Sequence, residues 1–89
     1  MPSTDHYPAT TGLLEDGAAL GEALVAGDLQ EGRFRARLIA GAALSLNLVT
    51  VRAAAGAVIH YLGAGDQLPL PGYAAAVLAL SGALLEIPG

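Results

Sequence analysis

The sequence predicts an all-α protein, an antiparallel up-down four-helix bundle. Apolar residues recur at steps of four, three and four, which places them along one face of a helix. Glycine, proline and asparagine divide the chain into four such segments with short connections, the pattern of an up-down bundle. The chain has no Cys, no Trp and a single Phe. Its core must therefore be aliphatic and rich in alanine, with side chains small enough for helices to approach closely.

The first helix is predicted to begin at Thr10 or Thr11, either of which can cap it, and to end near Ala26. Residues 1–10 hold two prolines and several polar side chains, so they are expected to form a flexible leader. Residues 11–87 then form a single bundle domain, as a length of 89 residues allows. The inner face of this helix is expected to be Leu13, Gly17, Leu20 and Leu24.

The second helix follows Gly27-Asp28, a pair that ends the first helix and caps the next. We expect this helix to run from about Leu29 to Leu46, because Asn47 tolerates turn geometry and breaks it. Its inward side is predicted to be Phe34, Leu38, Gly41 or Ala42, and Ser45.

The third helix is predicted from Val49 or Thr50 to Leu62, and the fourth from about Tyr73 to Leu85. Between them, GAGDQLPLPG contains two prolines and three glycines and cannot continue a helix. The expected inner faces are Val51, Ala55, Val58 and Leu62 in the third helix, and Tyr73, Val77, Leu80 and Leu84 in the fourth.

The charge balance argues against a nucleic-acid partner. The net charge is −4 and the sequence pI is about 4.7, whereas phosphate neutralisation needs a basic patch. All four basic residues are arginines, and Arg33, Arg35 and Arg37 form a cluster. The cluster is either the solvated start of a helix or a place to dock a carboxylate or a phosphate.

The hydropathy pattern predicts a cytoplasmic protein without membrane contact. The longest uncharged run, residues 67–85, contains Pro69 and Pro71, and a spanning helix needs about 20 strongly apolar residues. The amino terminus has no basic start and no apolar segment, so it does not resemble a signal peptide.

The sequence contains few candidate catalytic residues, so an enzyme, a cofactor and a metal site are not expected. Ser45 and Ser81 have no neighbouring base, which argues against nucleophilic catalysis. His60 has no second ligand at metal-binding spacing. It is expected to cap terminal carbonyls of the third helix or to interact with its dipole.

The stretch AGDLQEGRFRARLIAGAALSLNLVTVRAAAGAVIHYLGAGD resembles a histidine-containing phosphotransfer (Hpt) domain. Ala26-Gly27-Asp28 matches the turn of that family, and Arg37-Leu38-Ile39-Ala40-Gly41 follows nine residues after Asp28, at the family's spacing. The small-residue run after Gly41 continues the match, and the resemblance covers residues 12–87. It implies a four-helix bundle that exchanges phosphoryl groups with receiver domains in two-component signalling.

The departures from the family fall on its chemistry. Arg37 stands where the resemblance implies the phosphoacceptor His, and Ala40 stands where a lysine is usual. A guanidinium stays protonated and has no free lone pair, so it cannot accept a phosphoryl group as an imidazole does. Phosphotransfer is therefore expected to be lost.

A degenerate Hpt domain would act by docking a response-regulator receiver domain or a sensor histidine kinase. The expected docking surface is Arg33, Arg37, Ala40, Gly41 and Leu44, with Arg37 reaching an acidic pocket. Gly41 either gives that partner room or allows tight packing between helices. Two alternatives stay open. One is an active phosphotransfer protein that uses His60, and the other is a small helical protein, unrelated to phosphorelays, that forms homodimers or assembles with partners.

Overall fold

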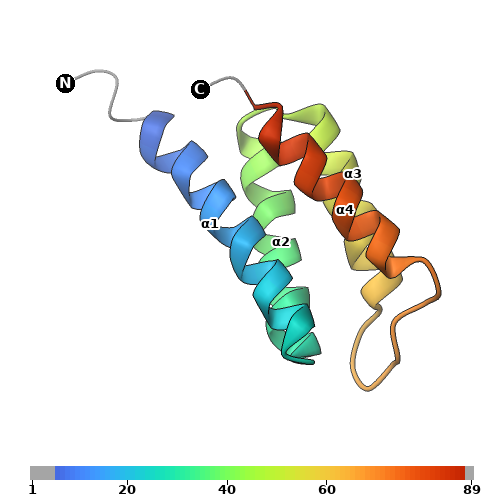
Figure 1. Cartoon of the computed structure of the whole chain (residues 1–89). Helices are drawn as coiled ribbons and strands as arrows, with labels where there is room; N and C mark the ends of the chain where they lie inside the picture. Colours follow the sequence, from blue (N-terminus) through green and yellow to red (C-terminus); the bar gives the residue numbers. More distant parts are fainter. Residues whose placement is uncertain (1–5, 88–89) are drawn as a thin grey trace.

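A computed structural model describes residues 6–87, with side chains from residue 11 onward. Within this range the chain forms four helices and no strand: α1 His6–Val25, α2 Leu29–Ser45, α3 Val49–Leu62 and α4 Tyr73–Leu85. Each helix packs against the next along the chain, and a smaller contact joins α1 to α4 (Figure 1). The all-α class and the four helices are thus confirmed. None of the described helices is both long and apolar enough to cross a membrane.

The start of α1 differs from the prediction. The helix begins at His6 rather than at Thr10 or Thr11, so the second half of the expected leader is helical. Pro8 does not prevent this, because it lies in the first turn, where backbone N–H groups have no partner within the helix. The first half of the expected leader, residues 1–5, lies outside the described residues.

The two turns on either side of α2 form as predicted. Gly27 has φ +77°, and the Asp28 side chain accepts a hydrogen bond from the Glu31 backbone N–H at 3.1 Å. At the other end Asn47 has φ +58°, a left-handed conformation that Asn adopts more readily than most residues. The Leu48 N–H then bonds the Ala43 carbonyl at 2.9 Å and closes the helix end.

The core lies where three of the four predicted inner faces meet. In α1, Leu13 and Leu20 are buried, and a Cβ added at Gly17 would stand 2.6 Å from the Leu84 side chain of α4. The four residues predicted for α3 are all buried. In α4, Leu80 and Leu84 are buried as predicted, but Ala76 joins them in place of Tyr73, which is exposed. Close approach through small residues is therefore a feature of this fold.

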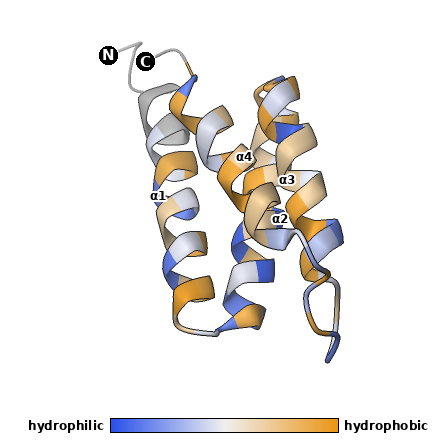
Figure 2. Ribbon diagram, turned by 45° about the vertical axis from the view of Figure 1, so that its right-hand side comes forward, coloured by the Kyte–Doolittle hydropathy of each residue, from blue (hydrophilic) through white to orange (hydrophobic). Residues whose placement is uncertain are grey.

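The predicted inner face of α2 is wrong. Phe34, Leu38 and Ser45 are exposed. The buried residues of α2 are instead Gly32, Arg33, Ala36, Ile39 and Ala43. Because α2 packs against both α1 and α3, its inner side is crowded, and small residues suit that side better than a phenyl ring. Figure 2 shows several hydrophilic segments on α1 and α2, whereas α4 is drawn in orange and pale colours along its length.

Candidate partner-binding surface

The three clustered arginines of α2 have different surroundings and do different things. Positions two apart on an α-helix are separated by about 200° of rotation, so Arg35 lies on the opposite side of the helix from Arg33 and Arg37. Arg33 is buried, Arg35 lies between α1 and α2, and Arg37 is exposed. The sequence cluster is therefore not a single basic patch.

Arg33 is a structural residue, which corrects its expected place on the docking surface. Its residue surface is only 3% exposed, and its guanidinium reaches the end of α3. Nε and Nη2 donate to the Leu62 carbonyl at 3.3 and 3.0 Å, Nη1 to the Gly65 carbonyl at 2.8 Å, and Nη2 to the Gln67 carbonyl at 2.7 Å. One side chain thus caps α3 and fixes the loop that leads to α4.

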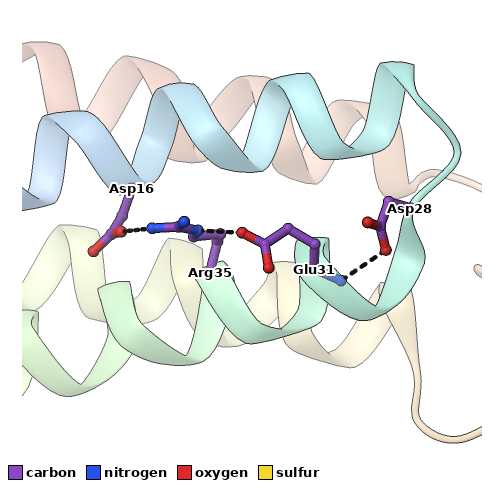
Figure 3. Close-up of polar contacts among 4 residues, drawn as sticks. All are labelled: Asp16, Asp28, Glu31 and Arg35. Carbon is purple, nitrogen blue, oxygen red and sulfur yellow. Dashed lines mark hydrogen bonds and ion pairs between the residues drawn. The ribbon is translucent and has the colours of Figure 1, made fainter.

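Arg35 links α1 to α2. Figure 3 shows its guanidinium between the carboxylates of Asp16 in α1 and Glu31 one turn earlier in α2, at 2.7 and 2.6 Å. The hydrogen bond to Glu31, followed by that to Asp16, raises the pKa of Arg35 above its ordinary value. The guanidinium carbon also lies 5.7 Å from the centre of the Phe34 ring. Arg35 is committed to contacts within the chain.

Arg37 is exposed and forms no ion pair or side-chain hydrogen bond with the residues that the structure describes. Around it lie three exposed apolar side chains: Phe34 is 49% exposed, Leu38 40% and Leu44 57%. Together with Gly41 these residues form what we call the outer α2 face: Phe34, Arg37, Leu38, Gly41 and Leu44. Ala40 is half-buried at its edge.

Gly41 lies in the middle of the outer α2 face and packs against none of the side chains that the structure describes. It is exposed, and a Cβ added there would meet no atom within 4 Å. The alternative that Gly41 allows tight packing between helices is therefore wrong. A glycine inside a helix costs about 1 kcal/mol relative to alanine, and no contact within the described chain offsets that cost.

Arg52 of α3 adds a second cation beside this face, at a position that the sequence pattern of α2 does not indicate. It is exposed, and no described residue pairs with it. It lines a small hollow next to Leu44 and Asn47, where α2 meets α3. The sequence could have indicated that Arg52 has no ion-pair partner within its own helix, because α3 contains no carboxylate. The carboxylates of the first two helices lie in α1 and at the start of α2: Glu15, Asp16, Glu22 and Glu31. The positive charge near the outer α2 face is thus not locally neutralised.

His60 lies in the last turn of α3 and is exposed. Its ring meets that of Tyr61 edge-on, with centres 5.3 Å apart. Of its two expected roles, capping is not observed among the described residues, where the side-chain donors to the Leu62 carbonyl come from Arg33. Its place in the last turn is the one expected for an interaction with the helix dipole. In the part of the chain that the structure describes, no three His, Cys, Asp or Glu residues lie close enough together to hold a metal ion.

Comparisons with protein family models, with curated proteins and with solved structures found no match to this chain.

Proposed function

We propose that the protein is a docking domain of two-component signalling, a degenerate Hpt-like bundle with the antiparallel up-down arrangement. It acts in the cytoplasm and binds a receiver domain or a sensor histidine kinase through the outer α2 face, without cofactor or phosphate. The observation that carries the proposal is the exposed Arg37, which pairs with no described carboxylate, next to Gly41, whose surroundings are open.

The chemistry of this face fits a partner with an acidic hollow ringed by apolar residues. Arg37 offers a guanidinium that can bind a carboxylate through two parallel hydrogen bonds, and Arg52 adds long-range attraction nearby. Phe34, Leu38 and Leu44 offer apolar area around the charge, and interface hot spots often combine arginine with aromatic side chains. Receiver domains have an acidic phosphorylation pocket, as the resemblance implies.

Gly41 supports the same proposal from a different direction. A partner backbone can approach the helix most closely where no side chain stands. A glycine that costs helix stability and serves no packing contact is explained if an outside surface occupies that space. Arg37, in turn, prevents phosphotransfer at the family position, because a guanidinium has no free lone pair in its protonated form.

The test is calorimetric titration of the full chain with purified receiver domains and histidine kinases from its own organism. We expect at least one of them to bind, and Arg37→Glu to weaken that binding at least tenfold through charge reversal. Gly41→Leu should also weaken it, because the added side chain fills the approach space. Ala26→Glu, which adds a negative charge at the exposed turn between α1 and α2, is the control and should bind like the wild type.

The proposal fails if no receiver or kinase binds, or if Arg37→Glu and Ala26→Glu bind equally well. A kinase assay addresses the alternative of an active phosphotransfer protein that uses His60. If the chain acquires an acid-labile phosphoryl label that His60→Ala loses, the protein is an active phosphotransfer domain and the docking proposal is wrong.

A further inference from the structure

The outer side of α4 is apolar although it faces solvent. Helix α4 contains no charged residue, and its inner side already packs in the core through Ala76, Leu80 and Leu84. On the outer side Leu78 is 73% exposed and Leu85 is 82% exposed. A helix that is apolar all round is normally buried on all sides, so the outer side of α4 lacks a covering surface in the single chain.

The exposed residues of α4 follow the spacing of a helix-packing seam. Ala74, Leu78, Ser81 and Leu85 are all exposed and follow one another at steps of four, three and four. Residues spaced in this way present a narrow ridge of side chains that inserts between the side chains of another helix. The pattern points to a helix, rather than an extended segment, as the covering element.

A groove lies directly beside this ridge, where α4 meets α1. Its lining is almost entirely apolar and consists of Leu14, Gly17, Ala18, Ser81, Leu84 and Leu85. The ridge and the groove together form what we call the α4 outer face: Leu14, Ala18, Ala74, Leu78, Ser81 and Leu85. Because both shapes occur on one face, two copies related by a two-fold axis can place each ridge in the groove of the other.

Charge also favours a second copy as the occupant. The chain has a net charge of −4, so most ways of bringing two copies together place like charges against each other. A two-fold contact through α4 avoids this, because α4 has no charge to repeat across the axis. The carboxylates near this face, Glu15 and Glu22 of α1 and Glu86 directly after Leu85, are exposed, so they are expected at the rim of such a contact.

We infer that the protein forms a symmetric homodimer through the α4 outer face. The contact area is modest, since a helix of 13 residues is roughly 20 Å long at 1.5 Å per residue. Standard stable interfaces bury about 800 Å² per partner, so we expect a dissociation constant in the micromolar range. Helices α2 and α4 do not contact each other, so the dimer leaves both outer α2 faces open. The inference stands independently of the proposed function.

Sedimentation of the full chain over a range of about 5 µM to 1 mM tests the inference. The wild type should shift from the 8.9 kDa monomer to twice that mass as concentration rises. Leu78→Glu should weaken dimerisation at least tenfold, because the contact would bury a carboxylate among apolar side chains. Leu68→Glu is the matched control: Leu68 is 82% exposed but lies in the α3–α4 loop, so this variant should dimerise like the wild type.

A wild type that stays monomeric at 1 mM overturns the inference, and so does an equal loss of dimer in Leu68→Glu and Leu78→Glu. Because the chain has no cysteine, a second readout is available in Ser81→Cys and Leu68→Cys, each of which carries one thiol. Mild oxidation should yield a disulfide-linked dimer quickly for Ser81→Cys and slowly for Leu68→Cys. The opposite order would contradict the proposed interface. Circular dichroism confirms that each variant is folded.

Discussion

Arg33 and Arg37 are one helical turn apart in α2, yet one is buried and the other is exposed. The two positions differ by only about 40° around the helix, so rotation alone does not explain the contrast. Their position along the axis does. Arg33 is level with the end of α3, where terminal carbonyls have no partner within the helix and accept its hydrogen bonds. Arg37 lies one turn further along α2, beside the body of α3, whose carbonyls are already bonded, and so it stays in solvent. The end of a neighbouring helix therefore decides which arginine is structural and which is available to a partner.

The largest effect is expected for Arg33→Met, which should lower the free energy of unfolding by about 3 kcal/mol or more. Methionine fills much of the space but leaves the Leu62, Gly65 and Gln67 carbonyls without their donor. Urea unfolding followed by circular dichroism measures the change. Arg33→Lys keeps the positive charge, so its loss of unfolding free energy should be smaller than that of Arg33→Met. Some loss should remain, because one lysine cannot reach three carbonyls at once. A loss below 1 kcal/mol in Arg33→Met would show that the capping contacts do not stabilise the fold.

Two glycines of α2 extend the contrast between its inner and outer sides. Gly41→Ala should stabilise the protein by about 1 kcal/mol, because alanine is a better helix former and its methyl group meets open space. Gly32→Ala should gain less or lose stability, because its added Cβ would stand 3.1 Å from the Leu24 side chain. The same urea measurement compares the two variants. An equal gain in both would mean that the inner side of α2 is not tightly packed.

A smaller effect is expected for Arg35→Gln, which removes the ion pair to Asp16 of α1 and the ion pair to Glu31 within α2. The pairs are partly exposed, so the urea midpoint should fall slightly at low salt and return toward the wild-type value at 1 M salt. The carboxylates raise the pKa of Arg35, so its contribution is present below the ordinary arginine pKa and is lost only at higher pH. The difference between variant and wild type should therefore be the same at pH 7 and pH 10. If the stability difference between variant and wild type changed between pH 7 and pH 10, Arg35 would not be the source of that difference.

The smallest effect on stability is expected for Arg37→Gln. Its side chain is exposed and has no charged partner among the described residues, so the free energy of unfolding should stay within about 0.5 kcal/mol of the wild type. The contrast with Arg33→Met isolates position along the axis, since both variants remove one guanidinium from α2. A loss as large as that of Arg33→Met would mean that Arg37 also makes a buried contact.

The helices could be predicted from local sequence, but the orientation of α2 could not. Turn residues such as Asn47 act within a few neighbours, so α2, α3 and α4 end within a residue or two of the predicted positions. Which face of a helix is buried depends on the neighbouring helices that it packs against. In α2 two rows of side chains could face the core, and the row containing Phe34 has the larger side chains. The observed row, which contains Ala36 and Ile39, is favoured because α2 packs between two other helices.

The candidate site was predicted only in part for the same reason. Arg37 and Gly41 were selected by their distance from the Asp28 turn, and both lie exposed on one face. Arg33 was placed with them because four-residue spacing puts side chains close together on a helix, a rule that ignores the neighbouring helix end. Arg52 was missed because it comes from another helix, and only the packing of α2 on α3 brings it near Leu44.

Hydrogen exchange of the arginine side chains, followed by NMR, tests the distinction between Arg33 and Arg37 most directly. Each of the four arginines has one Nε–H, and single Arg-to-Lys variants assign the four signals. The Arg33 Nε–H, which bonds the buried Leu62 carbonyl, should exchange at least a hundredfold more slowly than that of Arg37. Equal, solvent-like exchange at both positions would contradict the division of α2 into a structural arginine and an available one.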